Sequence, residues 1–370
     1  MKREKLLNIL RVEFPNEYAE DWDNTGFMID CGRRSYECIL TALELTPEVM
    51  REAVEKGCDL VITHHPLIFK PIRSFDASLA EDRLVMDCIK NDISVFSIHT
   101  NCDNHKGGTN DYLSDLIGLE GTEALNPLKR AYCKFVVFVP AEHASAVIEK
   151  MGEMGGGSIG SYSNCTFSTK GTGSFKPLDG ANPHLGEIGK IEIVDEMRVE
   201  TILPFEKIEA VVEKVRSVHP YEEMAYDIIP LENIRKDSGG GRVGKLTEPT
   251  RLKELLERLK NVLSAEILKY TGDENRIIER VGLCTGSGSD FIRDAYKSGV
   301  ECFLTGDIKY HDAQFARINN LALVDIGHYE SEDLFKHLIK NLLAKEMESI
   351  DSKCDIHVSE TDINPFRYYQ

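Results

Sequence analysis

Hydrophobic positions in the first third of the chain follow two alternating patterns. Apolar residues recur at helical spacing in 5–14, 47–56, 80–91 and 108–117. Short apolar runs lie at 36–43, 59–63 and 93–98. Helical spacing predicts amphipathic helices, and short uniformly apolar runs bounded by turn residues predict buried strands. This alternation predicts an α/β domain with a central sheet.

The pattern changes near residue 126 and returns after residue 241. In between we expect strands at 132–140, 190–199 and 199–203, and helices at 144–154 and 206–217. The polar run DSGGGR at 237–242 predicts a flexible linker. After it we expect helices at 252–259, 290–298, 311–319 and 330–342, and strands at 278–284, 302–305 and 321–325.

This order predicts a discontinuous α/β domain made of residues 1–126 and 242–370. Residues 127–241 are expected to form an inserted α+β domain with a small ferredoxin-like sheet. The length of 370 residues suits two such domains.

Composition narrows the class of protein. The net charge of −18 disfavours binding to nucleic acid, which needs Lys and Arg to neutralise phosphates. The sequence contains no run of about 18 apolar residues, so we expect no membrane span. The N-terminus is basic, but charges interrupt its apolar residues, so we expect no signal peptide. The ten cysteines include no C-x-x-C pair, which favours reduced thiols and a cytoplasmic protein.

The first motif with candidate chemistry is VITHHPLIF, where His64 and His65 end a predicted strand. Ligands in open α/β sheets bind just beyond the carboxyl ends of strands. Adjacent strand residues point to opposite faces, so both rings reach one site only if the chain leaves the strand there, as Pro66 favours. The two rings could then serve two different metal ions. The alternative is one core histidine and one exposed histidine.

The second motif, SIHTNCDNHKGGTND, follows the next predicted strand. Asp103 is a hard oxygen ligand suited to bridging two cations, and His99 and His105 flank it. The alternative is that Asp103 only shapes the turn before a helix.

The third motif is VDIGHYESEDLF. On a helix, His328 and Glu332 lie four residues apart and therefore share one face. This spacing suits two ligands of one cluster, although a surface His–Glu pair has the same spacing.

These three motifs share one position, the end of a predicted strand. Histidine with Asp and Glu gives a nitrogen and oxygen ligand set without thiolate, which favours a catalytic pair of divalent ions (Zn, Fe, Mn or Ni) over a closed structural zinc site. Such a pair lowers the pKa of a bound water toward neutrality.

Two further motifs have open interpretations. In GLCTGSGSDFIRDA, the turn around Gly286 either binds an anion at a helix N-terminus or serves as a packing turn. In LTGDIKYHDAQ, Asp307 and His311 either line the same cleft or belong to a helix cap with a partly exposed histidine.

ITHHPLIF, HTNCDNHKGGTND, TGDIKYHDAQ and GHYESE together resemble the dinuclear metal centre proteins, also called GTP cyclohydrolase 1 type 2 homologues or the Nif-three-like family. EDWDNTGF, with Asp23, fits the opening motif of that family. The resemblance covers nearly all of 1–126 and 242–370. Within the insert, GGGSIGSYSNCTF and HPYEEMAYDIIPL resemble the PII/CutA-like ferredoxin domain of longer bacterial members.

The resemblance implies two divalent metal ions, with Asp103 and Glu332 helping to bridge them. It maps the metal ligands onto His64, His65, Asp103, His328 and Glu332. It also places His99 beside the ions, and it implies a ring-shaped homohexamer.

Two functions follow as hypotheses. The first is a metal-dependent hydrolase acting on a small, nucleotide-like substrate, with His99 or His311 moving protons. The family name points to GTP. The second is a metal-binding or regulatory ring protein without catalysis, in which the insert senses a small effector.

Overall fold

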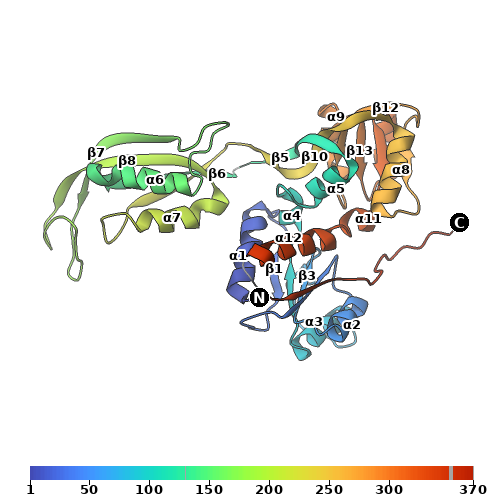
Figure 1. Ribbon diagram of the computed structural model, residues 1–370, viewed down its shortest axis with the longest axis horizontal. Coiled ribbons are helices and arrows are strands. Elements are labelled where there is room, and N and C mark those ends of the chain that lie inside the picture. Colours follow the sequence, from blue (N-terminus) through green and yellow to red (C-terminus); the bar gives the residue numbers. More distant parts are fainter. Residues whose placement is uncertain (130, 350–352, 370) are drawn as a thin grey trace. The chain divides into compact units, whose positions relative to one another are not determined.

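The computed structural model describes residues 1–129, 131–349 and 353–369. The chain divides into two compact units, one of Met1–Leu128 with Lys236–Gln370 and the other of Lys129–Arg235 (Figure 1). The domain boundaries expected from the sequence, at 126 and 242, lie within six residues of these limits. The structure is of the α/β class, as predicted.

The first sheet of the larger unit has five strands. Their spatial order is β1 (Gly26–Ile29), β4 (Ser94–Ser97), β3 (Leu60–Thr63), β2 (Cys38–Ala42) and β15 (Asp355–Val358). β4, β3, β2 and β15 are parallel to one another, and only β1 is antiparallel to its neighbour β4. Because β2, β3 and β4 are parallel, the residues that follow them meet at one edge of the sheet.

Both faces of this sheet are buried, which is why its strands are uniformly apolar. Leu40, Val61 and Val95 pack with α2 (Pro47–Glu55) and α3 (Ala80–Lys90). Ile39, Leu60 and Ile62 pack on the other face with α1 (Arg3–Glu13) and α12 (Phe335–Ser349) (Figure 1). Neighbouring residues therefore alternate between two cores.

A second sheet in the same unit has six strands. Their order is β11 (Lys269–Thr271), β14 (Ala322–Asp325), β13 (Cys302–Thr305), β12 (Ile277–Leu283), β10 (Arg235–Arg251) and β5 (Leu119–Leu128). The single central sheet predicted from the sequence is therefore wrong. Periodicity identifies strands, but it does not say which strands pair. Here the strands form two sheets, and each sheet takes one strand from the other segment of the unit: β15 joins the first sheet and β5 joins the second.

The remaining helices of this unit cover the second sheet or connect the strands to the site. They are α4 (Thr100–Asn104), α5 (Thr109–Ile117), α8 (Leu252–Leu263), α9 (Ile292–Lys297), α10 (Tyr310–Ile318) and α11 (His328–Glu332). Single 3₁₀ turns lie at η1 (Asn16–Tyr18) and η4 (Ser289–Phe291). The single helix predicted at 330–342 is wrong, because the chain forms α11 and then starts a new helix, α12.

The predicted flexible linker at 237–242 is also wrong, because these residues lie inside β10. Their glycines permit close approach between backbones. A Cβ on Gly239 would lie 2.2 Å from the carbonyl oxygen of Asn126, and one on Gly241 would lie 2.7 Å from that of Leu283. The glycines therefore mark tight strand packing rather than flexibility.

The smaller unit contains a four-stranded antiparallel sheet. Its strand order is β7 (Thr166–Phe175), β8 (Glu192–Pro204), β6 (Tyr132–Pro140) and β9 (Tyr226–Leu231). α6 (Ala144–Glu153) and α7 (Ile208–Arg216) share its core, and 3₁₀ turns precede them at η2 (Ala141–His143) and η3 (Phe205–Lys207).

The chain order of this unit is βαββαβ, the order of elements in ferredoxin-like folds. The likeness to PII and CutA proteins stays a prediction. The two strands expected at 190–203 are one strand, β8, and the glycine-rich stretch before it contributes β7. Among the described residues, no helix combines the length and apolar character that crossing a membrane requires.

A buried arginine in β10 generates a stability prediction. The Arg242 side chain is 1% exposed, and its Nε and Nη2 donate to Asp111 at 2.9 and 2.7 Å. Arg242→Met should lower the free energy of unfolding by about 3–5 kcal/mol, because Asp111 would be left without its cation. Urea denaturation followed by the fluorescence of Trp22 measures this. Lys245→Met, on the same strand as Arg242, breaks an exposed pair with Glu279 of β12 and should lower the free energy of unfolding far less than Arg242→Met. Equal effects of the two variants would contradict the prediction.

Candidate metal centre

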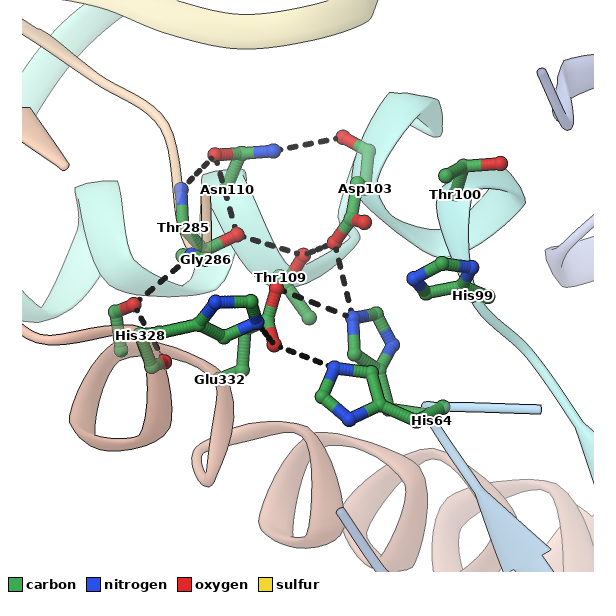
Figure 2. Close-up of polar contacts among 12 residues, drawn as sticks. His64, His99, Thr100, Asp103, Thr109, Asn110, Thr285, Gly286, His328 and Glu332 are labelled. Carbon is green, nitrogen blue, oxygen red and sulfur yellow. Dashed lines mark hydrogen bonds and ion pairs between the residues drawn. The ribbon is translucent and has the colours of Figure 1, made fainter. Parts of the chain in front are cut away.

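The five residues expected to bind metal lie close together at the carboxyl ends of strands from both sheets. Figure 2 shows four of them, His64, Asp103, His328 and Glu332. His64 and His65 follow β3, Asp103 lies in α4, and His328 and Glu332 begin and end α11. Potential ligand atoms of His64, Asp103 and Glu332 lie within 4.8 Å of one another. The same holds for His65, His328 and Glu332.

The backbone explains how neighbouring histidines reach one site. The N–H groups of both His64 and His65 donate to the carbonyl oxygen of Leu43, at 3.0 and 2.9 Å. The chain therefore turns away from strand geometry directly after β3, as the proline at position 66 led us to expect. The two rings lie with centroids 5.3 Å apart and at an angle of 37°.

His64 presents a buried nitrogen toward two carboxylates. Its Nδ1 donates to the carbonyl oxygen of Ile98 at 2.9 Å, which leaves Nε2 available as an acceptor or ligand atom. Nε2 lies 3.6 Å from an oxygen of Asp103 and 3.6 Å from an oxygen of Glu332. Among the described residues, this fully buried Nε2 has no hydrogen-bond partner. A buried nitrogen that faces two carboxylates and lacks a hydrogen-bond partner is suited to binding a cation.

Glu332 belongs to both groups of potential ligands. Its Oε1 faces His64, whereas its Oε2 lies 2.8 Å from Nε2 of His65 and 2.9 Å from Nε2 of His328. The Glu332 carboxylate thus belongs to two ligand groups. His64 belongs to one of these groups and His65 to the other. Asp103 is grouped only with His64 and Glu332, so the bridging role that the resemblance implies for Asp103 stays a prediction.

The two outer histidines are oriented by further carboxylates. Nδ1 of His65 lies 3.3 Å from Glu44, and Nδ1 of His328 lies 2.7 Å from Asp307. Histidines that bind metals commonly donate their other ring nitrogen to a carboxylate in this way, which fixes the ring and its tautomer.

The electrostatics of the cluster favour added positive charge. Burial alone would lower the pKa of His65, but hydrogen bonds to Glu332 and Glu44 outweigh it and raise this pKa to about 10. The hydrogen bond to Glu332 is the main cause that raises the pKa of His328 to about 9. Burial opposes ionisation of Glu332, yet the neighbouring histidines hold its pKa well below the usual value. The site therefore attracts cations, whether protons or metal ions.

The glycine-rich turn after β12 leaves space for the carboxylate of Glu332. Gly286 has a φ of +64°, and a Cβ there would lie 1.8 Å from Oε1 of Glu332. The N–H of Gly286 donates to Ser331 at 2.9 Å, and the N–H of Gly288 donates to Thr305 at 2.8 Å. Of the two interpretations of this turn, the structure supports the packing turn.

His99 lies beside the cluster. Its ring is centred 5.1 Å from that of His64 and 5.6 Å from that of His65. Nδ1 of His99 lies 2.7 Å from Asp23, whose side chain is buried. Burial alone would raise the pKa of Asp23, but hydrogen bonds from His99 and Thr100 outweigh it and lower this pKa to about 2. Asp23 therefore remains ionised and holds the His99 ring in place.

His311 is not brought into the cluster. It is exposed in the first turn of α10, where its ring lies 5.4 Å from that of Tyr310. Within the described part of the chain, no hydrogen bond or ion pair joins His311 to the five cluster residues. The catalytic role expected for it stays a prediction.

Sequence reasoning missed several groups that position the ligands. Glu44 belongs to none of the motifs and could not be predicted to contact His65. Thr109, whose hydroxyl donates to Asp103, lies in the second motif, but only the histidines and Asp103 of that motif were predicted to belong to the site. Asp307 is not the cap of α10, because Lys309 occupies the N-cap position and its N–H donates to Asp312. Asp307 contacts His328 instead. Its position after a strand was the signal for that contact.

Gly286 offers a test of the space left for the Glu332 carboxylate. Gly286→Ala should weaken metal binding by about 10–100-fold, because the new methyl group displaces the Glu332 carboxylate. Competition with a fluorescent chelator measures the affinity. Gly299→Ala is the matched control, because Gly299 also has a positive φ, +76°, but open space around it. Equal loss of affinity in both variants would contradict the prediction.

Trp22 provides an optical test of metal binding. It is the only tryptophan of the chain, and its ring lies 6.0 Å from that of His99. Binding of paramagnetic Ni²⁺ at the cluster should therefore quench the intrinsic fluorescence by more than binding of Zn²⁺. Quenching should saturate near two Ni²⁺ per chain and shift to higher concentration in His65→Ala. Identical quenching curves for His65→Ala and the wild type would show that Ni²⁺ binds elsewhere.

Comparison with known proteins identifies relatives along the whole chain. The family model Duf34/NIF3 (NGG1p interacting factor 3) matches residues 1–365. A Bacillus subtilis protein named GTP cyclohydrolase 1 type 2 homologue is 37% identical over 99% of this chain and 98% of its own length. A homologue of the same name from Staphylococcus epidermidis is 34% identical over the full length of both.

Solved structures agree with this assignment. The crystal structure of a Bacillus cereus protein related to NIF3 has a TM-score of 0.85 and 34% identity, and covers 100% of this chain and 99% of its own. A Staphylococcus aureus protein has a TM-score of 0.75 and 29% identity over 100% of this chain and 99% of its own. The chain therefore belongs to the Duf34/NIF3 family, as its motifs had indicated.

Proposed function

We propose that this protein is a metal-dependent hydrolase that holds two divalent ions in the cluster. One observation carries the proposal: a buried carboxylate, Glu332, directs one oxygen to His64 and the other to His65 and His328. The ligand groups are His64, Asp103 and Glu332 for one ion, and His65, His328 and Glu332 for the other.

The residues present fit such ions. The unpartnered Nε2 of His64 and the absence of cysteine from the two ligand groups favour divalent cations bound by nitrogen and oxygen. The carboxylates that raise the pKa values of His65 and His328 make the potential of the site negative, which also favours cations. When bound, the ions supply Lewis acidity and lower the pKa of water toward neutrality.

The chain itself supplies proton transfer and access. Asp23 accepts a hydrogen bond from Nδ1 of His99, which leaves Nε2 of that ring to take up or release a proton. The side chains of His65 and His328 are 25% and 36% exposed, so a substrate can reach this edge of the cluster. His64 and Glu332 are buried and act as fixed ligands.

For the substrate we propose a nucleotide, and GTP is the first to test. The support is the name of the relatives, GTP cyclohydrolase 1 type 2 homologue, together with their similarity along the whole chain. The homohexameric ring that the resemblance implies is part of the proposal, and the mass of the particle in solution tests it.

Glu332→Gln tests the hydrolase. The variant keeps the shape of the side chain but removes its charge, so we expect fewer than two ions per chain and a loss of GTP turnover of at least about 100-fold. Elemental analysis and product detection measure the two effects. Asp333→Asn, which removes a carboxylate paired with Lys336 at the end of the same helix, is the control and should retain both properties.

The wild-type protein separates the alternatives. Two retained ions without turnover of any nucleotide would overturn the hydrolase and favour a regulatory metal-binding protein. Wild-type protein that binds no divalent ion after reconstitution would overturn both.

A further inference from the structure

A cavity of about 600 Å³ lies beside the exposed edge of the metal centre, and His65 and His328 form part of its wall. Cavities of roughly 300–1,000 Å³ hold small molecules rather than macromolecules. All its lining residues belong to the larger unit. A molecule bound in this cavity would therefore contact the two histidines that the proposed metal ions use.

The wall of this cavity is mainly apolar. Away from the histidines it is formed by Leu43, Ile267, Ile308, Pro365, Phe366 and Tyr368. Its charged residues already have partners. Glu44 contacts His65, Asp307 contacts His328, Asp325 pairs with Lys269 at 2.7 Å, Glu330 accepts from Asn364 at 3.0 Å, and Arg367 pairs with Asp362 at 3.2 Å. The cavity thus offers apolar surface rather than an unpaired charge, which suits the uncharged body of a ligand.

One side of the cavity is formed by residues 364–368, here called the strap. A second cavity, of about 650 Å³, lies against the strap as well. The aromatic rings of the strap are consequently poorly covered: Phe366 is 71% exposed and Tyr368 is 41% exposed. Two aromatic rings held at the mouth of an apolar cavity are available to stack on a planar ligand.

The strap is attached to the helix that carries the metal ligands. Nδ2 of Asn364 donates to Glu330 at 3.0 Å. Glu330 lies in α11 between His328 and Glu332. The same short helix therefore sets the position of the strap and the position of two metal ligands.

We propose that this cavity binds the planar aromatic ring of the substrate, with Phe366 and Tyr368 of the strap stacking on it. The inference rests on the proposed function, because it assigns the polar end of the same substrate to the metal centre. It goes further by naming the cavity and the residues that recognise the planar ring of that substrate.

The test compares ligands with and without the ring. Metal-loaded protein is titrated by calorimetry with guanosine monophosphate, adenosine monophosphate and inorganic phosphate. In the wild type, at least one of the two nucleotides should bind at least about tenfold more tightly than phosphate, which is the effect expected for stacking of one base. Phe366→Ala should remove this difference and leave the affinity for phosphate and the metal content unchanged.

Tyr369→Ala is the matched control, because Tyr369 is the neighbouring exposed aromatic residue of the tail but lines neither cavity. Equal binding of nucleotides and phosphate by the wild type would overturn the inference. So would a loss in Tyr369→Ala as large as in Phe366→Ala.

Failure of the proposed function gives a different result. If the wild type binds nucleotides through Phe366 but hydrolyses no nucleotide, the pocket stands and the hydrolase does not. If the protein hydrolyses GTP with a KM that Phe366→Ala leaves unchanged, the hydrolase stands and the assignment of the pocket is overturned.

Discussion

The buried negative charge of Glu332 is the interaction on which the rest of the site depends. Removing a carboxylate from water costs several kcal/mol unless cations or hydrogen-bond donors replace the water. Three histidines from two segments of the chain surround this carboxylate, and Gly286 leaves the space that it occupies. The surrounding fold holds the Glu332 carboxylate and the three histidine rings at fixed distances from one another.

Two sheets are needed because one sheet edge supplies only part of the cluster. The parallel strands β2, β3 and β4 bring Glu44, His64 and His65 to one edge, and β13 and β14 bring Asp307 and His328 to another. Ligands of α/β proteins usually bind at the carboxyl ends of parallel strands in one sheet. Here the site lies at the carboxyl ends of parallel strands from two sheets.

The sequence predicted the parts of the structure that depend on local patterns. The apolar runs at 59–63 and 93–98 correspond to β3 and β4, and four-residue spacing placed His328 and Glu332 on one helix, α11. The structure also brings together all five residues that the motifs indicated. These features can be predicted because burial on both faces of a strand requires a run of apolar residues, and one face of a helix requires residues spaced three or four apart.

What the sequence could not predict depends on contacts between distant segments. Strand pairing divided one expected sheet into two, and close backbone contacts turned an expected linker into a strand. The partners of the histidine rings were missed for the same reason. Glu44 and His65 are 21 residues apart, and the hydrogen bond between them exists only because β2 and β3 are neighbours.

The smaller unit joins the chain between two strands that are neighbours in the second sheet. β5 ends at Leu128, β10 begins at Arg235, and these two strands are adjacent in the second sheet. A whole folded module thus occupies the position that a hairpin turn takes between neighbouring strands elsewhere. Because the entropy of closing a loop grows only slowly with its length, such a position accepts a large insertion at little cost to the host. A chain with a short connection between β5 and β10 would keep every strand of both sheets, so the smaller unit is separable from the architecture that carries the site.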